Sequence, residues 1–262
     1  MKPFLNQDTQ SKNALYHVIP FPYEGTMTYR KGASKGPKRI LQASKQLEYY
    51  DFQTGTEPYT KGIHTTKPQK KDTLKLPENK TPIIIGGDHA TTIHVAPHIK
   101  KDTDILIFDA HPDMHYSWSG STQNHACVTR RLITTHNVHI AGLRSGDKQE
   151  IQELKKNPKT TYNTVNQPLS LKNLKQNIHI SIDVDVLTPS LIPHTGTPEP
   201  GGYTYRELLK LLEKAFIQRN VVSIDLVEFA PSQKEPVLAQ TQAFTLAKLI
   251  YTVIGLHIKH GK

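Results

Sequence analysis

The sequence of 262 residues predicts an α/β fold, in which helices cover a mostly parallel β-sheet. Short apolar runs alternate along the chain with longer segments of helical periodicity. The short runs are rich in Ile and Val and alternate little, as strands buried on both faces of a parallel sheet do. This repeated strand–helix–strand order favours right-handed crossovers within one sheet.

Five short runs are predicted to be strands: Ile83–Ile85, Ile105–Phe108, Val138–Ala141, Ile178–Val184 and Val221–Val227. Three longer segments are predicted to be helices: Pro37–Leu47, Tyr203–Ile217 and Thr241–Ile258. The first helix has Pro in its first turn, where Pro is tolerated. The last is apolar nearly throughout, so we expect its inner face to pack on the sheet.

Two stretches are predicted to be loops. Thr54–Lys80 is rich in Thr, Lys and Pro and lacks periodicity, so it is expected to be a surface excursion that could hold a short strand. Leu187–Gly202 contains four prolines and three glycines, too many for a long helix. Neither stretch reads as a linker and no repeat is visible, so residues 1–262 are expected to form a single domain.

Composition excludes several classes of protein. The formal net charge is +10, but the lysines are scattered in short runs, which is typical of a solvated surface rather than a nucleic-acid-binding stripe. By eye, no run approaches the roughly 20 apolar residues of a membrane span, and the start lacks the apolar region of a signal peptide, so no membrane partner is expected. The single cysteine, Cys127, argues against a disulfide framework or a Cys-rich zinc site. A cytoplasmic location is expected.

Acidic and histidine side chains follow four of the predicted strands. They are His89; Asp109, His111 and Asp113; Asp183 and Asp185; and Glu228. Open α/β sheets bind ligands at the carboxyl ends of their strands. Side chains two residues apart in an extended chain point to the same face, so each group can converge on one crevice.

Such a cluster needs a cation. Two like charges about 4 Å apart repel by about 4 kcal/mol at an effective dielectric constant of 20. Carboxylate and imidazole ligands without thiolate favour Mn²⁺, with Fe²⁺, Co²⁺ or Zn²⁺ as alternatives. Six ligand side chains are too many for one ion with an open position, so two bridged ions are expected. Each segment alone has an ordinary alternative, a tight turn or a helix N-cap, but their agreement favours the metal site.

Three motifs resemble those of the ureohydrolase family, which includes arginase and agmatinase. They are GGDHA (Gly86–Ala90), DAHPD (Asp109–Asp113) and SIDVDVLTPS (Ser181–Ser190). The likeness covers most of the chain, from Tyr29–Asp51 to Asp225–Pro231. It implies a three-layer α/β/α sandwich around a mostly parallel sheet, two manganese ions, and a homo-oligomer that is a trimer or a hexamer.

The resemblance also implies a role for each matching residue. One manganese would be held by His89, Asp109, Asp113 and Asp183. The second would be held by Asp109, His111, Asp183 and Asp185, with Asp109 and Asp183 bridging. His125 matches the family's acid/base histidine, and Glu228 matches the glutamate that binds the guanidinium group of the substrate.

These roles imply hydrolysis of a small cationic guanidino substrate to urea and a primary amine. A metal-bridging hydroxide would attack the guanidinium carbon, which is a poor electrophile. Asp113 and the metals would stabilise the tetrahedral intermediate, and His125 would protonate the leaving amine.

The predicted substrate is agmatine, which gives putrescine and urea. His115 stands where the arginase signature has an Asn, and the segment around His125 looks like that of archaeal-type agmatinases. Arginase or guanidinobutyrase activity is the alternative, and formimidoylglutamase activity is a weaker one. A non-catalytic member of the fold is disfavoured, because no expected ligand is missing. Thr188 replaces an Asp that is usual in the family. The resemblance therefore does not predict the conformation of this loop or its effect on substrate specificity. His94 and His98 are expected to be ordinary exposed or core histidines, His115 to line the pocket mouth, and Arg144 to be structural.

Overall fold

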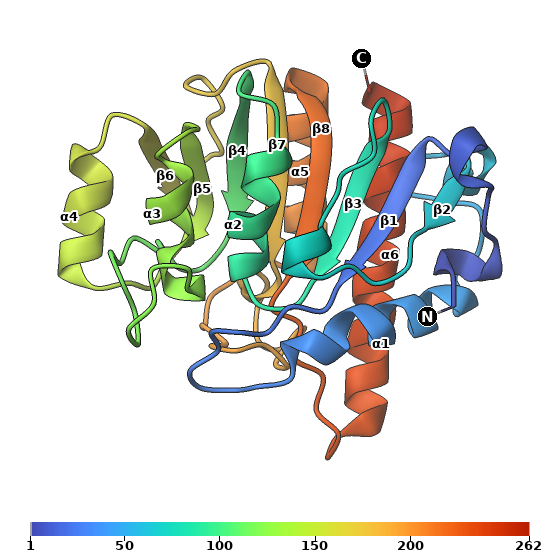
Figure 1. Ribbon diagram of the computed structural model, residues 1–262, viewed down its shortest axis with the longest axis horizontal. Helices are drawn as coiled ribbons and strands as arrows, with labels where there is room; N and C mark the ends of the chain where they lie inside the picture. The colour runs from blue at the N-terminus through green and yellow to red at the C-terminus, as the bar shows by residue number, and fades with distance from the viewer. Residues whose placement is uncertain (1, 262) are drawn as a thin grey trace.

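The computed structural model describes residues 2–261, and its centre is an eight-stranded sheet (Figure 1). The strands run in the order β2-β1-β3-β8-β7-β4-β5-β6, and every neighbouring pair is parallel. Their bounds are β1 Tyr16–Phe21, β2 Ile63–Thr65, β3 Thr81–Gly86, β4 Thr103–Phe108, β5 Val138–Leu143, β6 Thr160–Thr164, β7 Asn177–Asp183 and β8 Asn220–Val227. The expected parallel α/β architecture is therefore confirmed, while a single domain over 1–262 stays a prediction.

Helices cover both faces of this sheet, as Figure 1 shows for α2 in front and for α5 and α6 behind. Their bounds are α1 Gly36–Ala43, α2 Ala90–Val95, α3 Val128–Leu132, α4 Lys148–Lys156, α5 Tyr205–Gln218 and α6 Pro236–His260. One apolar cluster joins β4 and β5 to α2, α3 and α4, and a larger one joins β7 and β8 to α5 and α6. Each fully buried Ile or Leu in these clusters contributes about 1.5–3 kcal/mol to folding.

All five predicted strands are confirmed within a few residues. β2 is a short strand of the kind that the predicted loop 54–80 could hold, whereas β1 and β6 were not predicted. β1 contains His17 and Pro20, which interrupt its apolar run. β2 has three residues and lies inside the predicted loop 54–80, and β6 (TTYNT) is a polar edge strand. β2 and β6 are the two edge strands of the sheet, and edge strands are commonly short or polar, which discourages pairing with other chains.

The helix ends follow local capping chemistry. Thr204 caps α5 by accepting from the backbone N–H of Glu207, whose side chain in turn accepts from the backbone N–H of Thr204. The predicted helix Pro37–Leu47 ends as α1 at Ala43 and continues as a short 3₁₀ turn. α6 begins earlier than predicted, because Pro236 supplies a favourable first residue.

By length and composition, α6 is a helix that could cross a membrane, which corrects the sequence-based expectation that no such run is present. Its apolar window is 61% buried inside the protein. Buried residues such as Leu246, Leu249 and Ile250 belong to the large apolar cluster behind the sheet. The hydrophobicity of α6 is thus that of a core helix.

Strand order brings the predicted site residues together. The four strands whose ends carry them, β3, β8, β7 and β4, are neighbours at the centre of the sheet. Because all four are parallel, their carboxyl ends meet at one edge. The chain passes from β3 directly to β4 although β8 and β7 lie between them, and such switch points leave a crevice at the strand ends.

Candidate metal centre

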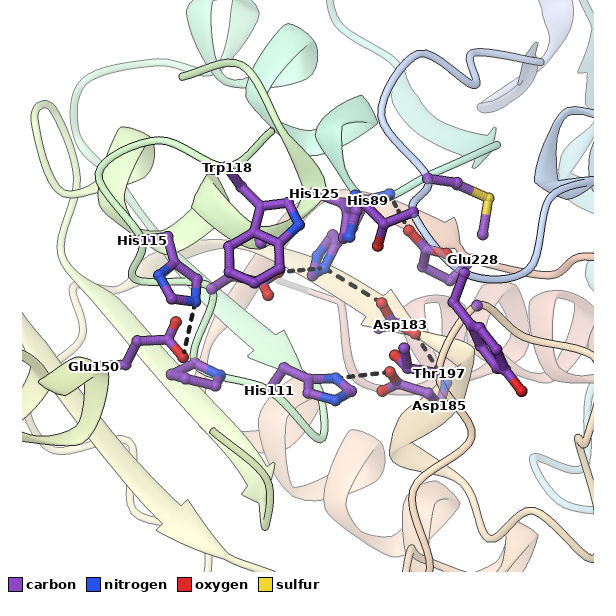
Figure 2. A pocket seen from close by; sticks show the side chains of 17 residues that line it. His89, His111, His115, Trp118, His125, Glu150, Asp183, Asp185, Thr197 and Glu228 are labelled. Atoms are coloured by element: carbon purple, nitrogen blue, oxygen red, sulfur yellow. Dashed lines mark hydrogen bonds and ion pairs between the residues drawn. The ribbon is translucent and has the colours of Figure 1, made fainter. Parts of the chain in front are cut away.

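A cavity of about 180 Å³ opens at this edge of the sheet (Figure 2). Eight residues singled out from the sequence line it: His89, His111, Asp113, His115, His125, Asp183, Asp185 and Glu228. Asp109 lies beneath them with 1% of its surface exposed. The structure therefore brings all the predicted site residues to one place.

The first group of candidate ligands surrounds His89. Its Nδ1 atom lies 3.0 Å from Asp109 Oδ2, 3.1 Å from Asp113 Oδ2 and 3.3 Å from Asp183 Oδ2. This nitrogen is buried and has no hydrogen bond of acceptable geometry. A buried nitrogen that faces three carboxylate oxygens without a hydrogen bond fits a shared cation.

The second group surrounds His111. Its Nδ1 atom lies 3.0 Å from Asp185 Oδ2 and 3.5 Å from Asp109 Oδ1. Asp109 thus turns one oxygen to each group, as a bridging ligand must. Asp183 Oδ1 instead accepts from the backbone N–H of Asp185 at 2.9 Å, so its predicted bridging role stays a prediction.

Two of the carboxylates sit on strained backbone. The φ angle is 48° at Asp113 and 68° at Glu228, in the left-handed region that residues other than Gly rarely adopt. Glu228 is held there by its own N–H, which donates to the Gly87 carbonyl at 2.7 Å, and by its Oε1, which accepts from the His89 N–H at 2.7 Å. Only glycine fits at position 87, because a Cβ atom there would lie 1.8 Å from the Tyr23 carbonyl oxygen.

Crowding of the carboxylates perturbs their titration. Burial raises the pKa of Asp113 to about 7, and the negative charge of Asp109 adds to the effect. Burial also raises the pKa of Asp183 well above its ordinary value, and the charges of Asp185 and Asp109 act in the same direction. Burial lowers the pKa of His111, but the neighbouring carboxylates outweigh it and raise that pKa to about 12. Without metal, histidine protons supply the positive charge that the carboxylates require.

His125 is held by residues that the sequence analysis did not single out. The Thr26 hydroxyl donates to Asp88 Oδ2 at 3.1 Å, and its oxygen lies 3.2 Å from His125 Nδ1. Since the hydroxyl hydrogen is used on Asp88, His125 Nδ1 is the donor to Thr26, which leaves Nε2 with a lone pair. Burial, and then the charge of His89, lower the pKa of His125 to about 4. In the sequence, only Asp88, the Asp of the GGDHA motif, points to the contact between Thr26 and His125.

A second group of polar residues lines the same cavity. His115 Nε2 lies 3.3 Å from Glu150 Oε2, and the ring centroids of His115 and Trp118 are 4.6 Å apart. In Figure 2 these residues lie at the opposite end of the cavity from Glu228. Glu150 comes from α4 and Trp118 from the loop after β4, so no sequence motif connects them.

The remaining sequence-based expectations concern single residues. Arg144 is structural: its Nε donates to the Pro200 carbonyl and its Nη2 to the Glu199 carbonyl, both at 2.8 Å. His98 is exposed, whereas His94 packs edge-on against Tyr23. The backbone of Thr188 closes a turn by accepting from the N–H groups of Leu191 and Ile192. Cys127 is fully buried.

The donor set fits hard or borderline divalent cations, because carboxylate oxygens and imidazole nitrogens are their usual ligands. A model of the arginase family matches residues 14–255, which is most of the chain. The chain belongs to the arginase family. Within this family it carries candidate ligands for two metal ions.

Relatives within the arginase family are similar along their whole length. The N(1)-aminopropylagmatine ureohydrolase of Thermus thermophilus is 32% identical over 280 residues, covering 97% of this chain and 94% of the relative. The agmatinase of Pyrococcus horikoshii is 32% identical over 269 residues, covering 94% and 93%. The crystal structure of the agmatine ureohydrolase of Thermoplasma volcanium superposes with a TM-score of 0.84 at 25% identity, covering 99% and 95%. The arginase-like fold expected from the motifs is therefore confirmed.

Proposed function

We propose that this ureohydrolase cleaves agmatine to urea and putrescine. The observation that supports this substrate is the charge of the cavity. Its 17 lining residues, all within the described chain, include Asp and Glu but neither Lys nor Arg. A substrate carboxylate would meet these acids without a permanently cationic partner, which disfavours arginine, guanidinobutyrate and formimidoylglutamate. A substrate that is cationic at both ends is favoured instead.

Glu228 is the proposed partner of the guanidinium group. One of its oxygens is already used by the His89 backbone N–H, and the side chain lines the cavity. A buried carboxylate binds a planar guanidinium strongly, because the hydrogen bonds are assisted by charge. Glu228 therefore orients the guanidinium carbon beside the ligand cluster.

The reaction needs a nucleophile and a proton donor. Divalent cations held by the ligand cluster would supply the first, because such cations lower the pKa of water that they bind. His125 is the proposed proton carrier: with its pKa lowered to about 4 it is neutral near pH 7. Its Nε2 accepts a proton from the attacking water and returns it to the leaving amine. Asp113 lines the same cavity and can accept hydrogen bonds from the tetrahedral intermediate.

The group of His115, Trp118 and Glu150 is the proposed site for the far amine. An ammonium group can lie over the face of Trp118, and the negative charge of Glu150 attracts it. Glu150 is 6% exposed, so its charge is screened little by solvent. The two ends of the cavity thus match the two cationic ends of agmatine.

N(1)-aminopropylagmatine is the second candidate substrate, because several relatives about 30% identical to this chain carry that activity in their names. Its additional amine would extend past the far end of agmatine. Asp147 lies there, with its Oδ2 3.8 Å from His115 Nε2 and its side chain 55% exposed. This carboxylate could pair with the longer polyamine at the rim.

The deciding experiment measures kcat/KM for five substrates with Mn²⁺ present. Urea release is followed for agmatine, N(1)-aminopropylagmatine, arginine and guanidinobutyrate. Formamide release is followed for formimidoylglutamate, whose reacting carbon carries a hydrogen in place of a third nitrogen. The proposal expects agmatine to have the highest value. A higher value for N(1)-aminopropylagmatine would replace agmatine with the second candidate, and a preference for a substrate with a carboxylate would overturn the charge argument. A homo-oligomer and a cytoplasmic location stay predictions; light scattering after gel filtration measures the first.

A further inference from the structure

A column of polar side chains runs through the sheet below the candidate metal centre. Alternate residues of a strand point to the same face, and in β7 these are His179, Ser181 and Asp183. The neighbouring strand β8 places Ser223 beside His179 and Asp225 beside Ser181. We call His179, Ser181, Ser223 and Asp225 the polar column; Asp183, above it, is a candidate metal ligand.

The neighbouring strands place apolar residues beside the polar column, where an apolar residue would be the usual choice. On one side, Ile105 and Ile107 of β4 lie level with the first two members of the column. On the other side, Ile84 of β3 pairs with Asp225. The four members of the column are 0–3% exposed. Burying polar groups costs free energy unless each is hydrogen-bonded, whereas further Ile side chains would pack here without that requirement.

Asp225 is the centre of the hydrogen bonds in the column. Its Oδ1 accepts from the Ser181 hydroxyl at 2.6 Å, and its Oδ2 accepts from the hydroxyl of Thr92 in α2 at 3.0 Å. His179 Nε2 lies 3.0 Å from the same Oδ2 and must donate, because a carboxylate only accepts. The other ring nitrogen of His179 lies 2.7 Å from the Ser223 hydroxyl.

The column ends at a candidate metal ligand. His89 Nε2 lies 3.2 Å from Ser181 Oγ. Because Ser181 uses its hydrogen on Asp225, its oxygen must accept from His89, so His89 Nε2 carries a hydrogen. The other ring nitrogen, Nδ1, then keeps its lone pair for a cation when only one ring nitrogen is protonated. This is the nitrogen that faces three carboxylates without a hydrogen bond.

We propose that Ser181 and Asp225 are positioning residues, which fix the ring orientation and tautomer of His89 and so raise the affinity for the ion that it binds. The inference rests on the proposed metal-binding role of His89. His179 and Thr92 keep Asp225 in place by occupying its second oxygen. Ligating histidines are commonly held through their other nitrogen, and loss of that partner weakens metal binding roughly 10- to 100-fold.

Calorimetric titration of metal-free protein with Mn²⁺ tests the proposal, and it does not depend on turnover. Ser181→Ala and Asp225→Asn should each weaken binding of one ion roughly 10- to 100-fold and change binding of the other less. Ser181→Thr keeps the hydroxyl and should restore most of the affinity. Circular dichroism checks that each variant is folded. If Asp225→Asn does not fold, the comparison of Ser181→Ala with Ser181→Thr still tests the proposal.

Asp51→Asn is the matched control, because Asp51 is also fully buried and accepts from Thr54 and Thr252, away from the cavity lining. It should lower the melting temperature and leave Mn²⁺ affinity unchanged. Wild-type affinity in Ser181→Ala, or an equal loss in Asp51→Asn, would overturn the proposal. A wild-type protein that binds no Mn²⁺ would overturn it together with the metal site, whereas one that binds Mn²⁺ without cleaving agmatine would affect only the proposed function.

Discussion

Replacing Glu228 with Gln should reduce agmatine cleavage far more than it reduces folding stability. The two side chains have the same shape, and the amide oxygen of Gln can still accept from the His89 N–H, as Glu228 does at 2.7 Å. What the variant loses is a negative charge on a side chain that is only 6% exposed. The bound guanidinium would then be buried without its carboxylate partner.

Removal of one partner from a buried ion pair costs about 3–5 kcal/mol. Since about 1.4 kcal/mol corresponds to a factor of ten, kcat/KM should fall roughly 100- to 5,000-fold. The assay follows urea release over a range of agmatine concentrations with saturating Mn²⁺, together with metal content and melting temperature. Glu153→Gln is the control, because it makes the same chemical change outside the cavity lining. Wild-type kcat/KM in metal-loaded Glu228→Gln would refute the guanidinium-binding role.

Three further predictions test other parts of the molecule. His125→Ala should lower urea release about 100-fold or more while manganese content stays at the wild-type level; full turnover would remove its proton-carrying role. Trp118→Ala should raise KM for agmatine up to about 30-fold with a smaller effect on methylguanidine, which lacks the far amine; equal effects on both would argue against a far-amine site. Burial raises the pKa of Asp51, but hydrogen bonds from Thr252 and Lys248 outweigh it and leave the pKa below its ordinary value. Wild-type stability should therefore fall as pH drops below about 4, and urea unfolding should show a weaker pH dependence in Asp51→Asn.

The centre of the fold could be predicted from the sequence because its strands are buried on both faces. β3, β4, β7 and β8 are short Ile- and Val-rich runs, and each ends at or within three residues of a predicted site residue. These residues are His89 after β3, Asp109 after β4, Asp183 as the last residue of β7, and Glu228 after β8. Local pattern therefore located both the strand and its functional end. The peripheral strands gave no such signal: β6 is polar, and β2 has only three residues.

The missed functional residues have a different origin. Thr26 reaches His125 across 99 positions of sequence, and Glu150 reaches His115 from a separate helix. Only the folded chain creates these pairs, and each partner alone looks like an ordinary surface residue. In β7, by contrast, the alternation of His179, Ser181 and Asp183 is visible in the sequence. The Ile residues between them make the strand as a whole look apolar, which obscures this alternation.

The left-handed backbone at Asp113 and Glu228 has a consequence for protein engineering. Glycine adopts this conformation more easily than any residue with a side chain, so exchange to glycine at either position would relax the loop. The same exchange would delete a carboxylate from the cavity. A library of variants selected only for heat tolerance would therefore be drawn toward inactive proteins at these two codons. A selection for thermostability should therefore keep Asp113 and Glu228 unchanged and vary surface residues instead.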